Sequence, residues 1–487
     1  MIRSICVAGS GTAGNIFALT LKKAFPTCEI IKVHSPEIGI VGVGEGSTEH
    51  WKVFMNICDI PLGEMIVECS ATHKLGIRFE GWTKHTPDYF HSISGNEHLN
   101  NFGLMGLYCG LNENNKLLTN SISYRGLIEH SLHATDPHQR TNQFHFDTFK
   151  LNKYFEKLCI QRNIKLIEAE ITKVNINPDN GNVASVSLST GVDVSSDIFI
   201  DATGFRRVLM SSIGANKWRS YSRYLPMNAA IAFPSELPEN RKINPYTRAI
   251  AKSAGWMWEI PTQERRGNGY VYCSDFISEE EAIQEASEQV GFNVQPARKF
   301  VIDPGCLEKQ WVNNVISAGL CSSFVEPLEA TSIGSTVQQA LAAVRHLAGY
   351  NGNPVLADRY NSRMDEMMEN LVSMISLHYI SDRDDSEFWK NAASLPRPEY
   401  LEDLLELWSV RPPADGDIKK GHYELFHEAH FWHVAQGQGL ISKDGSSRII
   451  DMLDIRQAVN KKIWEIRVEQ TAHPVVDHLE ALLALKE

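Results

Sequence analysis

No stretch of the sequence approaches the roughly 18 consecutive apolar residues that a membrane-spanning helix needs. The N-terminus passes from Met1 through a short apolar segment into glycines, without the apolar core of a secretory signal peptide, so we expect the mature fold to start at residue one. Long basic stretches are missing too, and 59 acidic against 47 basic residues give a net charge of −12. Because phosphate backbones attract positive patches, the sequence predicts neither a membrane nor a nucleic acid as partner.

Paired cysteines are also missing. Nine Cys residues are scattered along the chain and never form a C-x-x-C pair, which is typical of a reducing compartment, and we therefore expect a cytoplasmic protein. Repeats and low-complexity segments are absent, and 43% hydrophobic with 22% charged residues is a globular composition. A chain of 487 residues has room for two or three structural modules.

A glycine-rich turn stands near the N-terminus. Residues 3–8 have the apolar, β-branched character of a buried strand, and residues 9–14 read G-x-G-x-x-G. A helical repeat follows up to Pro26, and residues 29–33 have the character of a second strand. This order predicts a βαβ unit whose glycines let a pyrophosphate approach the positive end of the helix. A tight turn without a ligand is the alternative. The predicted cofactor-binding residues here are Gly9, Gly11, Thr12, Ala13 and Gly14.

A second strand of this kind occupies residues 197–201 and ends in a small-residue turn like those that approach bound FAD. The two strands lie more than 180 residues apart, which favours a flavoprotein with insertions over a compact NAD domain. We add Asp201 and Gly204 to the cofactor-binding residues. Residues 205–300 mix short strands with Gly and Pro, and we expect a sheet there that covers the cofactor.

The C-terminal part has helical periodicity. Apolar residues recur at helical spacing over 360–374 and 401–408, and residues 449–485 continue in helical sequence. We therefore predict an α/β fold with α+β insertions, consisting of a Rossmann-type FAD-binding module of the flavin monooxygenase kind and a mainly helical module. The predicted domains are residues 1–350, with substrate-side insertions at about 51–145 and 215–300, and a substrate-binding module at 351–487.

Three further motifs, with the glycine-rich turn, carry a resemblance to a known family. They are THKLGIRF at residues 72–79, GWMWEIP at residues 255–261, which contains W-x-W-x-I-P, and SFVEPLEAT at residues 323–331. In this combination and order the chain resembles the flavin-dependent halogenases, in particular their tryptophan-halogenase-like branch. The matches run from residue 5 to about residue 350, and weaker similarity continues to Pro413.

The resemblance implies a two-component enzyme with FAD, a halide and O2. FADH2 from a separate NAD(P)H-dependent flavin reductase would react with O2 to a flavin hydroperoxide, and halide would attack this to give hypohalous acid. The acid would travel to a separate electron-rich aromatic substrate, such as an indole or a phenol. Chloride, bromide and iodide all stay open as the halide, and so does a homo-oligomer.

Lys74 and Glu329 match the family's catalytic lysine and glutamate. On a strand, Lys74 would point away from the apolar face, and a desolvated amine there could hold hypohalous acid or attack its halogen. A solvated strand lysine is the alternative. Glu329 would take the proton from the ring carbon or polarise the halogenating species. Its alternative is an ordinary role at a helix entry.

Residues next to this pair match other parts of the family's site. Thr331 or Ser332 is the expected N-cap of a helix whose free N–H groups would face a halide or the reduced flavin, so both are predicted to bind halide. The family has S-T-G where this chain has A-T-S, which leaves halide preference open. Trp256 and Trp258 would wall off the flavin from the substrate, and ordinary buried aromatics are the alternative.

Two segments fit the family less well. Residues 42–48, with Gly44 and Glu45 as cofactor contacts, resemble its flexible strap only loosely, and a flexible surface turn is the competing interpretation. The second strand ends in His34-Ser35 instead of an acidic ribose ligand, with Glu37 two residues later, so FAD would be held less tightly.

A histidine-rich segment near the C-terminus requires a check for metal. Its residues do not form the H-E-x-x-H motif, and histidines spaced by three residues do not stay on one face of a helix. We therefore expect an ordinary polar face and no metal. The residues of this segment are His422, Glu424, His427, Glu428, His430 and His433. Tryptophan halogenases carry tyrosines near here, whereas this chain has Phe431-Trp432-His433, which makes free tryptophan a doubtful substrate. An FAD-dependent aromatic hydroxylase and a non-catalytic FAD-binding protein stay as alternatives.

Overall fold

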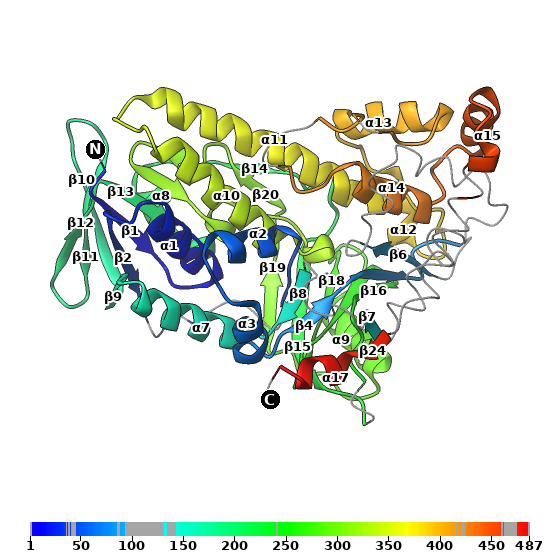
Figure 1. The fold of residues 1–487 in the computed structure, drawn as a ribbon, viewed down its shortest axis with the longest axis horizontal. Coiled ribbons are helices and arrows are strands. Elements are labelled where there is room, and N and C mark those ends of the chain that lie inside the picture. The colour runs from blue at the N-terminus through cyan, green and yellow to red at the C-terminus, as the bar shows by residue number, and fades with distance from the viewer. Residues whose placement is uncertain are drawn as a thin grey trace.

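A six-stranded sheet, parallel except at one edge, organises the N-terminal half of the computed structural model (Figure 1). The structure describes residues 2–35, 37, 39, 45–84, 88–92, 131–133, 143–239, 242–414, 416–419, 424–458, 461 and 475–485. In spatial order the strands are β21 (Trp311–Val312), β22 (Val315–Ser317), β13 (Ile198–Asp201), β1 (Ser4–Ala8), β2 (Glu29–His34) and β9 (Lys165–Glu168). The two predicted strands, β1 and β13, are direct neighbours.

Both faces of this sheet are covered, which explains why the central strands β1 and β13 are mostly apolar and buried. Ile5 and Val7 of β1 face the core that includes α1 (Thr12–Ala24), whereas Cys6 and Ala8 face the core of a small antiparallel sheet. The small sheet is made of β10 (Ile171–Ile176), β11 (Val183–Leu188) and β12 (Asp193–Ser195). The helices beside α1 are α7 (Thr148–Gln161) and α10 (Thr331–Leu347). The predicted βαβ unit is confirmed.

The second large sheet has seven strands, and the W-x-W motif lies on one of its inner strands. Its order is β19 (Arg298–Val301), β15 (Ala229–Glu236), β18 (Arg265–Tyr272), β17 (Gly255–Pro261), β16 (Thr247–Lys252), β5 (Gly76–Glu80) and β6 (Asp88–Ser92). A three-stranded sheet consists of β3 (Glu45–Gly46), β8 (Gln143–Phe146) and β4 (Thr72–Lys74). Its strand β4 directly precedes β5 of the seven-stranded sheet along the chain. The expected sheet within residues 205–300 is present.

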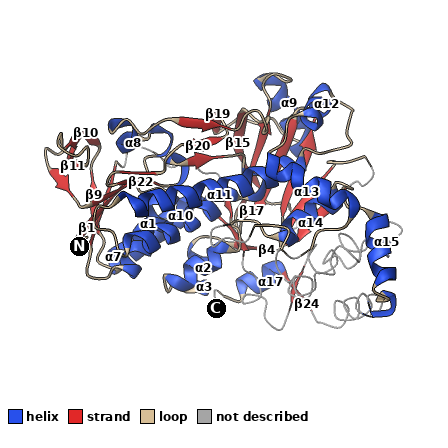
Figure 2. Cartoon of the chain, turned by 90° about the horizontal axis from the view of Figure 1, so that it is seen from above, coloured by secondary structure: helices blue, strands red, loops and turns tan. Residues whose placement is uncertain are grey.

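Helices connect the two halves. Figure 2 shows α10 and α11 (Pro354–His378) side by side, with α11 leading toward the C-terminal helices. These are α12 (Glu387–Ser394), α13 (Glu399–Val410), α14 (Glu428–Gly437), α15 (Lys443–Met452) and α17 (His478–Leu483). The other α-helices among the described residues are α2 (His50–Ile57), α3 (Leu62–Glu68), α8 (Val208–Ser212) and α9 (Glu279–Val290). Short strands β14 (Trp218–Ser220), β20 (Gly305–Leu307) and β23 (Ser323–Phe324) form one more sheet.

The prediction of helical sequence throughout residues 449–485 is wrong at two described places, namely residues 453–455, which are not helical, and a strand near the end of the range. β24 (Val475–Asp477) is extended and pairs antiparallel with β7 (Ser131–His133). Two β-branched valines in succession favour a strand, and a remote partner completes it. Within the described ranges, no helix is long and apolar enough to cross a membrane. The eight cysteines described are all unpaired and buried.

Candidate active site

A cavity of about 510 Å³ reaches from the glycine-rich turn to the seven-stranded sheet. Its lining includes most of the residues selected from the sequence, namely Gly9, Gly11, Thr12, Ala13, Glu45, Lys74, Gly204, Trp256, Trp258 and Ser332. Gly14, Asp201, Glu329 and Thr331 are described but do not belong to this lining, and Gly44 falls outside the described residues. The fold thus brings segments more than 320 residues apart, from Gly9 to Ser332, to one cavity.

The glycine-rich turn has the shape that a pyrophosphate requires. A Cβ on Gly9 (φ 116°) would lie 2.3 Å from the carbonyl oxygen of Ala202, and one on Gly14 would lie 2.2 Å from that of Gly9. Gly11 is different, because a Cβ there would meet nothing within 4 Å. It is also the N-cap of α1 and forms no side-chain cap, so the helix presents free N–H groups beside open space. These features fit a dinucleotide such as FAD.

Asp201 shapes the cofactor side of the cavity without lining it. Its buried carboxylate accepts hydrogen bonds from the backbone N–H and the hydroxyl of Thr203 and from the N–H groups of Leu209 and Met210. These bonds occupy both oxygens and hold the turn in which Gly204 reaches the cavity. Asp201 therefore holds this turn and does not belong to the cavity lining, and its contact with the cofactor stays a prediction.

The end of β2, where an acidic residue usually binds the ribose, carries, among the residues described there, no acidic side chain that lines the cavity. His34 and Ser35 line the cavity, whereas Glu37 is exposed and does not. His34 lies 3.5 Å from Glu156 of α7. The end of β2 thus offers an imidazole and a hydroxyl where an acidic ribose ligand is usual.

Trp256 and Trp258 form one wall of the cavity. They stand two residues apart on β17 and both line the cavity, with ring centroids 6.1 Å apart. The indole N–H of Trp256 donates to Glu326 Oε1 at 3.1 Å, and the Tyr379 hydroxyl donates to the same oxygen. Burial raises the pKa of Glu326 to about 7. These bonds fix Trp256 within the wall.

Lys74 is enclosed. Its side chain is fully buried, and Nζ donates to the carbonyl oxygen of Ser47 at 2.9 Å. Burial lowers the pKa of this amine to about 8, although Glu329 and Glu49 oppose the shift. The alternative of a solvated strand lysine is therefore wrong. Ser47 lies two residues after Glu45, so the expected strap, residues 42–48, contacts both the cavity and the amine.

Glu329 lies at the end of a short 3-10 turn that precedes α10 and is fully buried. Its Oε1 accepts hydrogen bonds from His91 Nδ1 at 2.8 Å and from His378 Nε2 at 2.9 Å. Burial by itself would raise the pKa of this carboxyl, but His91 and His378 hold it well below its usual range. Oε2 has no hydrogen-bond partner among the described residues. Glu329 thus offers one occupied and one free oxygen.

The helix that follows begins differently from the prediction. Its N-cap is Ala330, in a left-handed conformation (φ 55°) without a side-chain cap, and Thr331 and Ser332 already belong to the first turn. The prediction that either hydroxyl caps the helix is therefore wrong. The left-handed Ala330 takes the N-cap position, so the helix already begins at Thr331. Ser332 lines the cavity, and the hydroxyl of Thr331 is buried without a hydrogen-bond partner in the described ranges.

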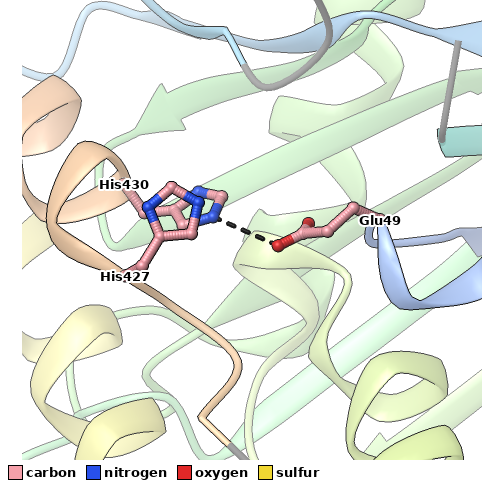
Figure 3. A group of neighbouring side chains, drawn as sticks. All are labelled: Glu49, His427 and His430. Carbon is pink, nitrogen blue, oxygen red and sulfur yellow. Dashed lines mark hydrogen bonds and ion pairs between the residues drawn. The ribbon is translucent and has the colours of Figure 1, made fainter. Parts of the chain in front are cut away.

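The expectation of an ordinary polar face on the histidine-rich segment is also wrong. His430 and His433 on α14 are buried, since the helix packs against β6. His430 Nδ1 lies 2.9 Å from His91 Nε2, and its Nε2 lies 3.3 Å from Glu49 Oε1. Figure 3 shows both His427 and His430 beside Glu49, and potential ligand atoms of these three lie within 4.8 Å of one another. His422 falls outside the described residues.

The sequence profile described as tryptophan halogenase matches residues 4–454. The chain belongs to this family. Tryptophan 6-halogenase SttH of Streptomyces toxytricini is 32% identical over 85% of each chain. Tryptophan 7-halogenase RebH of Lentzea aerocolonigenes is 28% identical over 96% of each. The crystal structure of SttH superposes with a TM-score of 0.89 over 99% of both chains at 28% identity. The α/β fold and the resemblance are confirmed.

The halogenase is therefore an enzyme that uses reduced flavin to halogenate an aromatic substrate. This decides against the hydroxylase and the non-catalytic protein that the sequence alone left open. Sequence analysis missed Glu49, His91, Glu326 and His378, although Glu326 stands inside a quoted motif. The two histidines and Glu49 occur in no recognisable pattern, so only their contacts identify them.

Proposed function

We propose that the halogenase takes FADH2 from a separate flavin reductase and delivers hypohalous acid through Lys74 and Glu329 to an electron-rich indole or phenol. The observation that supports this most strongly is the shared cavity, which the glycine-rich turn, the tryptophan wall and Lys74 all line. When bound, the reduced flavin would supply two electrons to O2, and O2 would take two more from the halide, which gives hypohalous acid and water.

The chain's own residues hold the two reactants apart. Gly11 and the first N–H groups of α1 bind the pyrophosphate, and Trp256 and Trp258 keep the aromatic substrate away from the flavin. Ser332 and the start of α10 lie on the cavity at a positive helix end that suits a halide. This separation prevents direct oxygenation of the substrate.

Lys74 and Glu329 then act on the halogen and on the ring. Because burial lowers the pKa of Lys74 to about 8, more of it is the free amine than in an exposed lysine, and the free amine can bind hypohalous acid by a hydrogen bond or through nitrogen. The ring carbon that gains the halogen must lose its proton. Glu329 Oε2 accepts this proton, since it is the oxygen without a partner among the described residues.

The experiment combines the protein with FAD, NADH, a flavin reductase and a panel of indoles and phenols. Mass spectrometry compares reactions with chloride, bromide, iodide and no halide. We expect products whose mass rises by one halogen in place of one hydrogen, only in the presence of halide and reductase. A gain of one oxygen, or product without halide, would contradict the proposal.

The substrate is expected to be an aromatic other than free tryptophan. Phe431, Trp432 and His433 on α14 are almost completely buried and carry no phenol that could hold an amino-acid backbone. The relatives SttH and RebH are named for tryptophan, so free tryptophan belongs in the substrate panel as the comparison. Initial rates should be higher for at least one simple indole or phenol. Halogenation of free tryptophan alone would refute this prediction.

The glycine-rich turn gives a matched pair of variants. Gly11→Ala places a methyl group in open space, and its φ of −65° suits alanine, so the unfolding temperature should not change. The methyl group would stand where the pyrophosphate approaches the backbone. The affinity for FAD should therefore fall at least about tenfold, or ~1.4 kcal/mol. Gly14→Ala forces a Cβ to within 2.2 Å of a backbone oxygen and should lower the unfolding temperature. Flavin fluorescence titration and calorimetry separate the two effects, and equal FAD affinity in Gly11→Ala would argue against this binding mode.

A further inference from the structure

Lys32 is a fully buried lysine on β2, close to the glycine-rich turn. It lies opposite Val7 of β1 and Leu166 of β9 in the sheet, and its neighbours Ile31 and Val33 belong to the core on the other face. Because side chains alternate along a strand, Lys32 projects toward the face that α1 and α7 cover. Lysines are almost never fully buried unless they are paired, so this position requires an explanation.

The ammonium of Lys32 has no paired anion within the protein. Among the described residues it forms no ion pair, and its hydrogen bond goes to a neutral group, the side-chain oxygen of Asn15, at 2.5 Å. Burial lowers the pKa of this amine, and Cys159 and Glu156 oppose that shift. Buried charges usually face a partner of opposite sign, because removing them from water is costly. A bound anion could supply that partner.

Hydrogen bonds connect Lys32 to the cavity. The amide nitrogen of Asn15, in α1, donates to the carbonyl oxygen of Ser10 and to Asn152 Oδ1, both at 2.9 Å. The amide nitrogen of Asn152, in α7, donates in turn to Thr12 Oγ1 at 3.2 Å. Ser10 and Thr12 both line the cavity, so the network ends at the glycine-rich turn.

All of these bonds have the same direction, away from Lys32. An ammonium can only donate and a carbonyl oxygen can only accept, so Asn15 turns its oxygen toward Lys32 and its nitrogen toward Ser10. Thr12 Oγ1 accepts from Asn152, which leaves the hydroxyl hydrogen of Thr12 to donate. No acceptor for this hydrogen exists within the part of the chain that the structure describes. The turn therefore offers a donor to an anion in the cavity.

The charge of Lys32 also acts on a residue of the cavity lining. His34 stands two residues further along β2 and lines the cavity. Burial lowers the pKa of His34, and the positive charge of Lys32 lowers it further, whereas Glu156 and Glu168 oppose the shift. An anion in the same cavity would therefore be attracted by Lys32.

We propose that Lys32 is the buried counter-charge of the cofactor's pyrophosphate, and that Asn15 and Asn152 hold the Thr12 hydroxyl as a donor to this anion. This inference rests on the proposed function, in which the glycine-rich turn binds FAD. Lys32, Asn15 and Asn152 are positioning residues, since none of them lines the cavity. The network favours a flavin with a pyrophosphate, FAD, over riboflavin, which has no phosphate.

The first test is Lys32→Met, because methionine fills a similar volume without the charge. Flavin fluorescence titration should show at least about a tenfold loss of affinity for FAD and an unchanged affinity for riboflavin. The unfolding temperature of the protein without FAD should stay the same or rise, because the variant no longer buries an unpaired ammonium. Unchanged FAD affinity would overturn the proposal. A lower unfolding temperature with equal losses for both flavins would also overturn it, since Lys32 would then support only the fold.

Lys23→Met is the matched control for the removal of one positive charge. Lys23 lies at the other end of α1, pairs with Asp59 and is 49% exposed, so its loss should leave FAD affinity unchanged. A loss as large as that in Lys32→Met would show that net charge alone is responsible and would overturn the proposal.

The second test addresses the other end of the network. Thr12→Val keeps the shape of the side chain and removes the hydroxyl, whereas Thr12→Ser keeps the hydroxyl. FAD affinity should fall at least about threefold in Thr12→Val and stay close to that of the unaltered protein in Thr12→Ser. Equal FAD affinity in both variants would overturn the role of the hydroxyl. If the unaltered protein binds no FAD, the proposed function fails as well, whereas tight FAD binding that no variant changes overturns this inference alone.

Discussion

Lys74→Ala protein is expected to consume FADH2 at the rate of the unaltered enzyme and to form halogenated product at least about 100-fold more slowly. The reason is that Lys74 is the fully buried amine of the cavity lining, with a pKa lowered to about 8, and alanine removes the group that we propose holds hypohalous acid. FADH2 oxidation depends on the glycine-rich turn and the tryptophan wall, which the substitution does not touch. Parallel assays of flavin oxidation and of halogenated product measure the two rates.

A surface lysine provides the control for this experiment. Lys157 on α7 pairs with Glu64 and Glu68 and is 44% exposed, so Lys157→Ala should leave both rates unchanged. Free hypohalous acid should accumulate in the Lys74→Ala reaction and be detectable with a chemical trap. Halogenation at a normal rate in Lys74→Ala would show that the assignment of this lysine is wrong.

Glu329→Gln protein should keep its fold and lose at least about 100-fold in halogenation rate. Glutamine keeps the volume and can still accept hydrogen bonds from His91 and His378, but its amide cannot take a proton from the ring. Deprotonation of the ring then limits the reaction, so a substrate deuterated at the halogenated carbon should react more slowly than the protiated one. Thermal unfolding and the isotope effect are the measurements.

Glu326→Gln is the matched control, since it makes the same change three residues earlier in the same segment. Glu326 is buried, binds Trp256 and Tyr379, and has a pKa raised to about 7, so it already spends much of its time neutral at pH 7. This variant should retain most of the rate. Full activity in Glu329→Gln would remove Glu329 from the reaction.

Local sequence was a good guide where one segment contains the whole feature. The βαβ unit, the strand of the W-x-W motif and the long helix α11 are periodic patterns that each require only neighbouring residues. The start of α10 was not predictable in this way, because a left-handed non-glycine residue, Ala330, displaces the cap. The same holds for Asp201, whose acceptors are filled by backbone groups of the next turn.

The sequence by itself determined the fold class, the glycine-rich turn and the positions of Lys74 and Glu329, since each is carried by a contiguous motif. Only the tertiary structure decided the surroundings of Glu329. His91 comes from β6, His378 from α11 and His430 from α14, and the contact between His430 and Glu49 joins residues 381 positions apart. Periodicity reports which face of an element is buried, but a hydrogen bond between distant residues depends on how whole elements pack, and no local pattern encodes that.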